Sequence, residues 1–125
     1  MNNFLLVMLG GGLGAGARYG VAKLMPDSIK EVEFPWATLT VNLIGCFLIG
    51  LTWQALAKNH ALNALFVVGF LGGFTTFSSF GLDGVKLINQ GAFTSFFLYL
   101  FISNIVGLLF VVGGVKLSEV LRITI

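Results

Sequence analysis

GFLGGFTTFSSFG, which spans Gly69 to Gly81, is the stretch of the sequence that decides the fold. It lies within an uncharged run from Ala61 to Leu82, and about 20 apolar residues suffice for a helix to cross a bilayer. The centre of the run is poor helix sequence, because Gly72 and Gly73 precede two threonines and both residue types lower helix propensity. Irregular backbone at membrane depth survives only where protein or a water-filled cavity satisfies its polar groups. We therefore expect a broken transmembrane helix with a site at the break.

The composition is that of a membrane protein. The 125 residues are 57% hydrophobic and only 10% charged, whereas soluble domains carry about 25% charged residues. Four apolar segments account for almost the whole chain, at residues 4–24, 35–57, 61–88 and 92–116. The fold predicted for residues 1–125 is a single all-α membrane domain of four transmembrane helices with the third helix broken. No length remains for a soluble catalytic domain, so we do not expect an enzyme.

The charged residues and the single cysteine exclude several kinds of site. A net charge of +2, scattered along the chain, does not form the clustered basic face that nucleic acid binding requires. Cys46 is the only cysteine, so we expect neither a disulfide within the chain nor a multi-cysteine metal site. No lysine or arginine precedes the first apolar run, which argues against a cleaved signal peptide.

The first span is rich in glycine and ends in basic residues. Gly10 and Gly14, like the pairs at 12/16 and 16/20, have the spacing of small residues that lets two membrane helices approach closely. Arg18 is open to two interpretations. Its side chain can reach the interface as an ordinary snorkelling residue, or it can point into a vestibule and attract anions.

Neutral hydrogen-bonding side chains lie inside the spans, whereas the acidic residues lie in loops or at span ends. Asn42 is costly in a span unless it is partnered, so it is either an interhelical hydrogen-bonding residue or a pore-lining donor. Thr38 lies four residues earlier on the same face and is a candidate pore residue with it. Tyr99 and Ser103 are again four apart and form a polar stripe.

These neutral groups indicate which ion could pass. Ion-coupled transporters usually need a carboxylate within the membrane, and no span has one in its core. Hydroxyl and amide hydrogens can instead replace part of the hydration shell of a small anion. Phe74, Phe77 and Phe80 recur every three residues and are expected on one side of a helix. Their rings either form ordinary core packing, which the pattern alone favours, or present electropositive edges to an anion.

The basic residues give no clear orientation in the membrane, because orientation follows the Lys/Arg bias of short loops. The basic residues are divided almost evenly between the two sides of the membrane. Such an even distribution predicts insertion in both orientations and therefore an antiparallel homodimer, which resembles the inverted repeats of larger transporters. Backbone carbonyls freed between Gly72 and Thr75 in two copies could then surround one hard cation such as Na⁺. The two sides of the membrane would carry Lys58, Lys116 and Arg122 on one side, and Arg18, Lys23, Lys30 and Lys86 on the other.

Three motifs resemble those of the Fluc (CrcB) family of fluoride channels. GFLGGFTTFSSF resembles the third-span motif GFxGGxTTFSTF, LTVNLIGCF resembles the second-span motif, and GAGARYG resembles the first-span GAxxRY. The resemblance covers all four spans in order. It implies a passive, highly selective fluoride exporter of the bacterial inner membrane, assembled in the bilayer as a dual-topology dimer with two pores.

The resemblance also implies roles for single residues. Ser79 replaces the family's commoner threonine, Ala37 stands where glycine is frequent, and Cys46 where a small hydroxyl residue is common. By motif position, the resemblance implies Asn42 as the pore asparagine, Phe77 and Phe80 as the paired pore phenylalanines, Ser78 and Ser79 as the hydroxyls beside them, Tyr99 and Ser103 as the polar track, Arg18 near the vestibule, and the carbonyls of Gly72 and Thr75 as the central Na⁺ site.

Two other functions share some of these features. A small dual-topology multidrug exporter has the same size, number of spans and weak charge bias, but it needs a first-span glutamate that is missing here. A membrane scaffold subunit would account for the glycine-rich packing alone, but it leaves the polar residues in the spans without a role.

Overall fold

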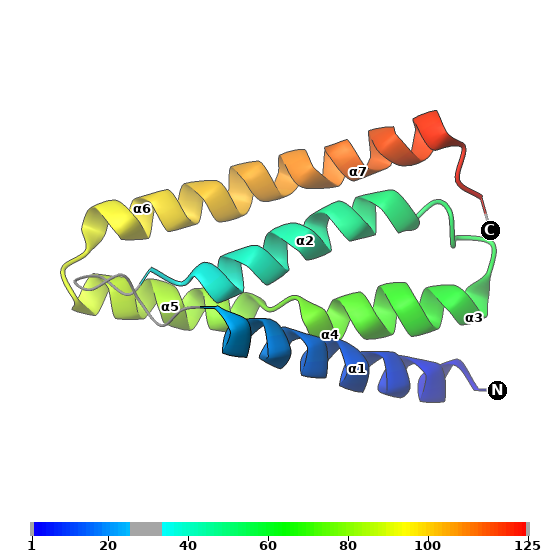
Figure 1. Cartoon of the computed structure of the whole chain (residues 1–125), viewed down its shortest axis with the longest axis horizontal. Helices are drawn as coiled ribbons and strands as arrows, with labels where there is room; N and C mark the ends of the chain where they lie inside the picture. Colours follow the sequence, from blue (N-terminus) through cyan, green and yellow to red (C-terminus); the bar gives the residue numbers. More distant parts are fainter. Residues whose placement is uncertain (1, 26–33, 125) are drawn as a thin grey trace.

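The computed structural model describes residues 2–25 and 34–124, and all regular structure in these two ranges is helical (Figure 1). This confirms the prediction of an all-α chain. Residues 26–33, between the first two predicted spans, lie outside the described residues, and so does Lys30 among the basic residues assigned to the two sides of the membrane. In chain order the elements are α1 (Asn3–Leu24), α2 (Trp36–Thr52), α3 (His60–Leu62), the π-helix η1 (Asn63–Leu71), α4 (Gly72–Phe74), α5 (Phe77–Asn89), α6 (Phe93–Phe101), the π-helix η2 (Ile102–Val106) and α7 (Gly107–Leu121).

These elements form four rods that run back and forth. Three of them are long and apolar enough to cross a membrane: α1 with 22 residues, the third rod from His60 to Asn89 with 30, and the fourth rod from Phe93 to Leu121 with 29. The second rod, α2, is apolar but only 17 residues long, so it ends before the predicted limit at 57. Both termini lie at the same end of the bundle (Figure 1). The chain is a multi-pass membrane protein.

Glycines allow the rods to pack in pairs, α1 against η1 and α4, and α2 against α7. A Cβ atom at Gly14 would meet the Phe70 carbonyl of η1, and one at Gly114 would meet the Phe47 carbonyl of α2. Close packing of Gly10 and Gly14 is therefore confirmed. The other predicted glycines of α1 lie on its outer face, where nothing approaches within 4 Å of the added Cβ of Gly12, Gly16 or Gly20.

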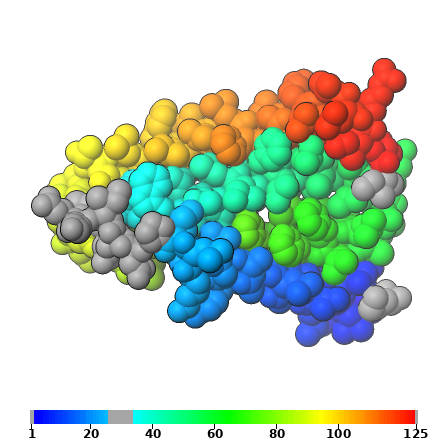
Figure 2. Space-filling model, viewed as in Figure 1, coloured from blue at the N-terminus to red at the C-terminus, as the bar shows by residue number. Residues whose placement is uncertain are grey.

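The buried core is small and lies where α2, α5 and α6 meet. Leu39, Leu87 and Tyr99 form it, and Phe34 and Phe80 are among the half-buried residues that pack on it. Elsewhere the rods expose large apolar side chains, as a surface that faces lipid or a second copy does. In the space-filling view, gaps are visible between α2 and the green residues of the third rod (Figure 2).

Candidate functional site

Two extended threonines separate α4 from α5 within the third rod. Thr75 has φ −83° and ψ 158°, and Thr76 has φ −153° and ψ 117°. The backbone N–H and the hydroxyl of Thr75 both donate to the Leu71 carbonyl, each at 3.0 Å, which completes the last turn of the helix before the interruption. The hydroxyl of Thr76 accepts from the Ser79 N–H at 3.2 Å, as an N-cap residue does. Thr75 is therefore the C-cap of α4, and Thr76 is the N-cap of α5.

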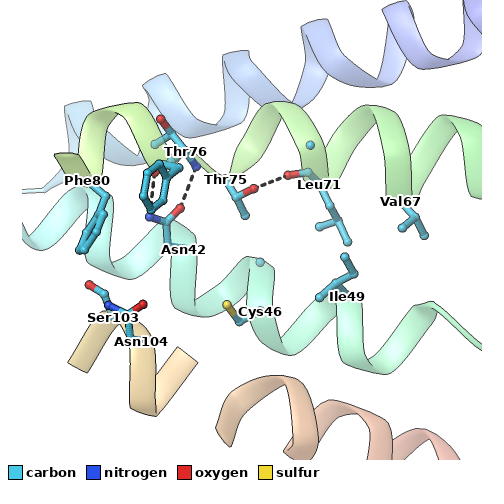
Figure 3. A pocket seen from close by; sticks show the side chains of 13 residues that line it. Asn42, Cys46, Ile49, Val67, Leu71, Thr75, Thr76, Phe80, Ser103 and Asn104 are labelled. Carbon is cyan, nitrogen blue, oxygen red and sulfur yellow. Dashed lines mark hydrogen bonds between the residues drawn. The ribbon is translucent and has the colours of Figure 1, made fainter. Parts of the chain in front are cut away.

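Asn42 of α2 takes over the hydrogen bonds that Thr76 cannot make within a helix. Its Nδ2 donates to the Thr76 carbonyl at 3.0 Å, and its Oδ1 accepts from the Thr76 N–H at 2.8 Å (Figure 3). Thr76 is only 8% exposed, so its backbone groups need partners inside the protein. Of the two interpretations of Asn42, the interhelical hydrogen bond is therefore formed, and the same residue also lines a cavity.

The larger cavity has a volume of about 380 Å³ and lies between α2, the third rod and η2 (Figure 3). Its lining brings together residues that are far apart in the sequence. Cys46 lies there too. The predicted site residues that line this cavity are Asn42, Gly72, Thr75, Phe77, Phe80 and Ser103.

A second cavity of about 360 Å³ lies between α1, α2 and the start of α5. Arg18 and Thr38 line it, together with Ala37 and Ser79. Ser78 and Tyr99 are in neither lining. Arg18 therefore shares a cavity with predicted pore residues, which is the arrangement that the vestibule interpretation requires.

Thr76 is the residue that lines both cavities; it is one of the neutral donors within the spans, but it was not among the predicted site residues. Its hydroxyl lies 3.1 Å from the Ser79 Oγ, to which it donates, and 3.3 Å from the Ser78 Oγ. A continuous set of hydroxyl groups therefore lies at the junction of the two cavities. The signal in the sequence was a threonine directly before the apolar Phe77, which is a typical position for a helix N-cap.

The interruption divides the phenylalanines into two groups, so the expectation that Phe74, Phe77 and Phe80 share one side of a helix is wrong. Phe74 is 6% exposed and stacks on Phe70 at a centroid distance of 5.8 Å. Phe77 is 81% exposed and tilts against Phe80 at 5.5 Å. Phe74 is thus a packing residue, whereas the Phe77 ring is left uncovered by its own chain.

The polar pair of the fourth rod also divides between two surroundings. Tyr99 is fully buried, packs against Phe80 at a centroid distance of 5.1 Å and donates its hydroxyl to Asp83 Oδ2 at 3.3 Å. Ser103 faces the larger cavity, and its Oγ is buried without a hydrogen-bond partner among the described residues. Tyr99 therefore packs behind Phe80, and the Ser103 hydroxyl is left without a partner in the wall of the cavity.

The carbonyls of Gly72 and Thr75, which the sequence predicts as ligands of a Na⁺, lack the partners that a continuous helix would give them. In an uninterrupted helix each would accept from the N–H four residues later. Those two N–H groups are diverted, because Thr76 donates to Asn42 and Ser79 donates to the Thr76 hydroxyl. Within residues 2–25 and 34–124 no group of three or more His, Cys, Asp or Glu side chains could hold a metal ion. Cation ligands at the interruption would therefore be backbone oxygens.

Comparison with known proteins places this chain in a family. The model of the CrcB-like protein family, also described as Camphor Resistance (CrcB), matches residues 5–115. A fluoride-specific ion channel FluC of Helicobacter acinonychis (strain Sheeba) is 46% identical over 120 residues, which cover 93% of this chain and 94% of the relative.

Two further relatives carry the same name. The protein of Helicobacter pylori (strain J99) is 44% identical over 93% of this chain and 92% of its own length. That of Phocaeicola vulgatus is 38% identical over 95% of this chain and 100% of its own length. These relatives are named as channels, not as enzymes. The family model and the relatives cover nearly the whole chain, so this protein belongs to the CrcB family.

Proposed function

We propose that the protein is a passive, highly selective fluoride channel that exports F⁻ across the bacterial inner membrane and so relieves fluoride toxicity. The observation that carries the proposal is the meeting at Thr76 of two cavities, one of which is lined by Phe77 and Phe80. The described lining of both cavities contains neutral donors and Arg18 but no carboxylate. Such a lining favours an anion and gives no group for coupling to protons or cations.

The proposed path begins in the cavity that contains Arg18. A fixed positive charge near a cavity raises the local concentration of anions, and the hydroxyls of Thr38 and Ser79 then provide the first replacements for water. The path continues past Thr76 to Asn42 and Ser103 in the larger cavity. Neutral donors stabilise an anion without holding it as tightly as a buried positive charge would, which permits exit as well as entry.

The phenylalanine rings contribute through their edges. A ring edge is electropositive and attracts an anion, whereas the face attracts a cation. The Phe77 ring is 81% exposed in one copy, which is costly at a membrane-embedded polar path unless a second copy covers it. We therefore propose that Phe77 and Phe80 form the narrow part of the path within a dimer.

The dimer that fits these features is antiparallel, with two pores and a structural Na⁺ at its centre. Gly72 is exposed, and nothing approaches within 4 Å of its added Cβ, so a second copy can reach its carbonyl. The carbonyls of Gly72 and Thr75 from both copies would bind the Na⁺, whose positive charge would hold the interrupted helices of the two copies together.

Labelling a cysteine placed at Arg122 from each side of intact membranes should modify about half of the copies from either side; modification from one side only would contradict the antiparallel dimer.

The direction of flow needs no additional energy source. Moving one charge through the membrane potential is worth about 2.3 kcal/mol per 100 mV. In a cell whose interior is negative, an anion is driven outward through a passive path. An open, selective pore is therefore sufficient for export.

An efflux experiment tests this function. Purified protein in liposomes loaded with fluoride should release it passively when the membrane voltage is shunted, and chloride should leave far more slowly. Phe77→Ile should slow fluoride release strongly while the dimer persists. Phe4→Ile is the matched control, because Phe4 is 67% exposed and lines neither cavity. Equal fluoride and chloride release, or release that requires a proton gradient, would contradict the proposal.

A small dual-topology multidrug exporter remains the alternative. It predicts proton-dependent flux of organic cations, so the same liposomes with a pH gradient and a fluorescent cation distinguish the two functions. The carboxylate-free lining of both cavities in the described residues favours the anion channel.

A further inference from the structure

Asn104 is a polar residue whose position the proposed path does not yet explain. It lies in the π-helix η2, near the middle of the fourth rod, and is exposed. Its Nδ2 donates to the Leu100 carbonyl at 2.8 Å. An amide offers two N–H donors and one carbonyl acceptor, and the described residues provide no other hydrogen bond to this side chain. One N–H and the Oδ1 therefore remain to be used, and an unused amide at membrane depth is costly.

The surroundings of Asn104 indicate how its amide is used. It lines the larger cavity together with Phe77 and Phe80 (Figure 3). Its neighbour Ser103 faces the same cavity, with a buried hydroxyl that has no partner among the described residues. Two adjacent residues thus bring unused hydrogen-bond donors to one wall of the cavity, and π-helical turns of this kind occur frequently at functional sites.

We propose that Asn104 is a further specificity-determining residue of this channel, whose second amide hydrogen and the Ser103 hydroxyl together replace water around fluoride beside the phenylalanines. The inference rests on the proposed function. Fluoride is smaller than chloride and accepts shorter, stronger hydrogen bonds, so donors at fixed positions favour fluoride when the ion loses water. Removal of the Asn104 amide should therefore slow fluoride more than chloride.

The test compares three variants in liposomes at equal protein density. Asn104→Leu removes the amide with little change in size and suits a lipid-exposed helix. Asn104→Gln keeps an amide on a longer side chain. Asn89→Leu is the matched control, because Asn89 is an exposed residue at the end of α5 that lines neither cavity. The measurements are initial fluoride and chloride efflux and the oligomeric mass in detergent.

A lost hydrogen bond to an ion corresponds to a change of about tenfold or more. We expect Asn104→Leu to lower fluoride efflux by that factor and to lower the fluoride-to-chloride ratio, with unchanged oligomeric mass. Asn104→Gln should be intermediate, and Asn89→Leu should match the wild type.

Three results would overturn the inference. Fluoride efflux within twofold of wild type in Asn104→Leu would remove the residue from the path. A smaller oligomeric mass in that variant would assign the amide to a contact between copies. A wild-type protein that releases no fluoride would overturn the proposed function and this inference with it, whereas the first two results leave the proposed function intact.

Discussion

At the scale of single residues, Asn42 combines two tasks that the sequence could only present as alternatives. A polar amide in an apolar span predicts a partner, and the hydrogen bonds between Asn42 and Thr76 confirm that part of the prediction. It could not identify the partner, because Thr76 is 34 residues away and the bond exists only once α2 lies beside the third rod. The side chain completes the backbone at the interruption and also lines the larger cavity.

Asn42→Asp tests both tasks. A carboxylate cannot donate to the buried Thr76 carbonyl, and an unpaired buried group costs about 1–3 kcal/mol. It also places a negative charge beside the proposed anion path. We expect lower unfolding temperature in detergent and at least tenfold slower fluoride efflux at neutral pH, where about 1.4 kcal/mol corresponds to a factor of ten.

Thr52→Val is the control for that variant on the same helix. The Thr52 hydroxyl donates to the Leu48 carbonyl at 2.7 Å, and Thr52 lines neither cavity. Wild-type efflux in Asn42→Asp would show that Asn42 is not beside the ion path.

At the scale of elements, the interruption of the third rod is the feature that positions the site. Low helix propensity predicted a break at Gly72 to Thr75; in the structure Gly72 and Gly73 stay helical in α4, and the extended residues are Thr75 and Thr76. The positions of the phenylalanine side chains were not predictable from their spacing, because two extended residues change the direction in which the side chains after them point. Phe74 therefore packs in a stack, while Phe77, three residues later, is exposed.

Thr76→Val isolates the contribution of one hydroxyl to the interruption. Valine has the same shape but cannot accept from the Ser79 N–H, and loss of such a cap costs about 0.5–2 kcal/mol. It also removes the hydroxyl at the junction of the two cavities. We expect reduced thermal stability and slower fluoride efflux, and recovery of both in Thr76→Ser. Equal behaviour of the valine and serine variants would contradict this role.

Glycine packing between α1 and the third rod allows a matched comparison. In Gly14→Ala the new methyl group meets the Phe70 carbonyl, and overpacking of this kind costs about 1–3 kcal/mol. In Gly16→Ala the methyl group enters open space, and alanine favours a helix over glycine by about 1 kcal/mol. Unfolding by denaturing detergent should therefore be easier for the first variant and no easier for the second. Equal destabilisation of both would mean that α1 packs through a different face.

At the scale of the whole molecule, the sequence was informative wherever a local property decides the outcome. Hydrophobic runs predicted that the chain is all-α. The absence of acidic residues from the cores of the spans agrees with the described linings of the two cavities, which contain no carboxylate. The limits of α2 were less predictable, because residues 53–57 are apolar enough overall to continue a span and form turns instead. Which residues meet at the site depended on contacts between rods, and for that reason Thr76 and Asn104 were not among the predicted site residues.

The most direct test of the central claim is the reversal potential of the current through the purified protein in a planar bilayer. Fluoride is given a tenfold gradient, with chloride equal on both sides and an impermeant cation. A passive fluoride-selective pore predicts reversal near the fluoride equilibrium potential, about 59 mV for a tenfold gradient of a monovalent ion. Reversal near 0 mV, or reversal that follows a proton gradient instead, would contradict the account.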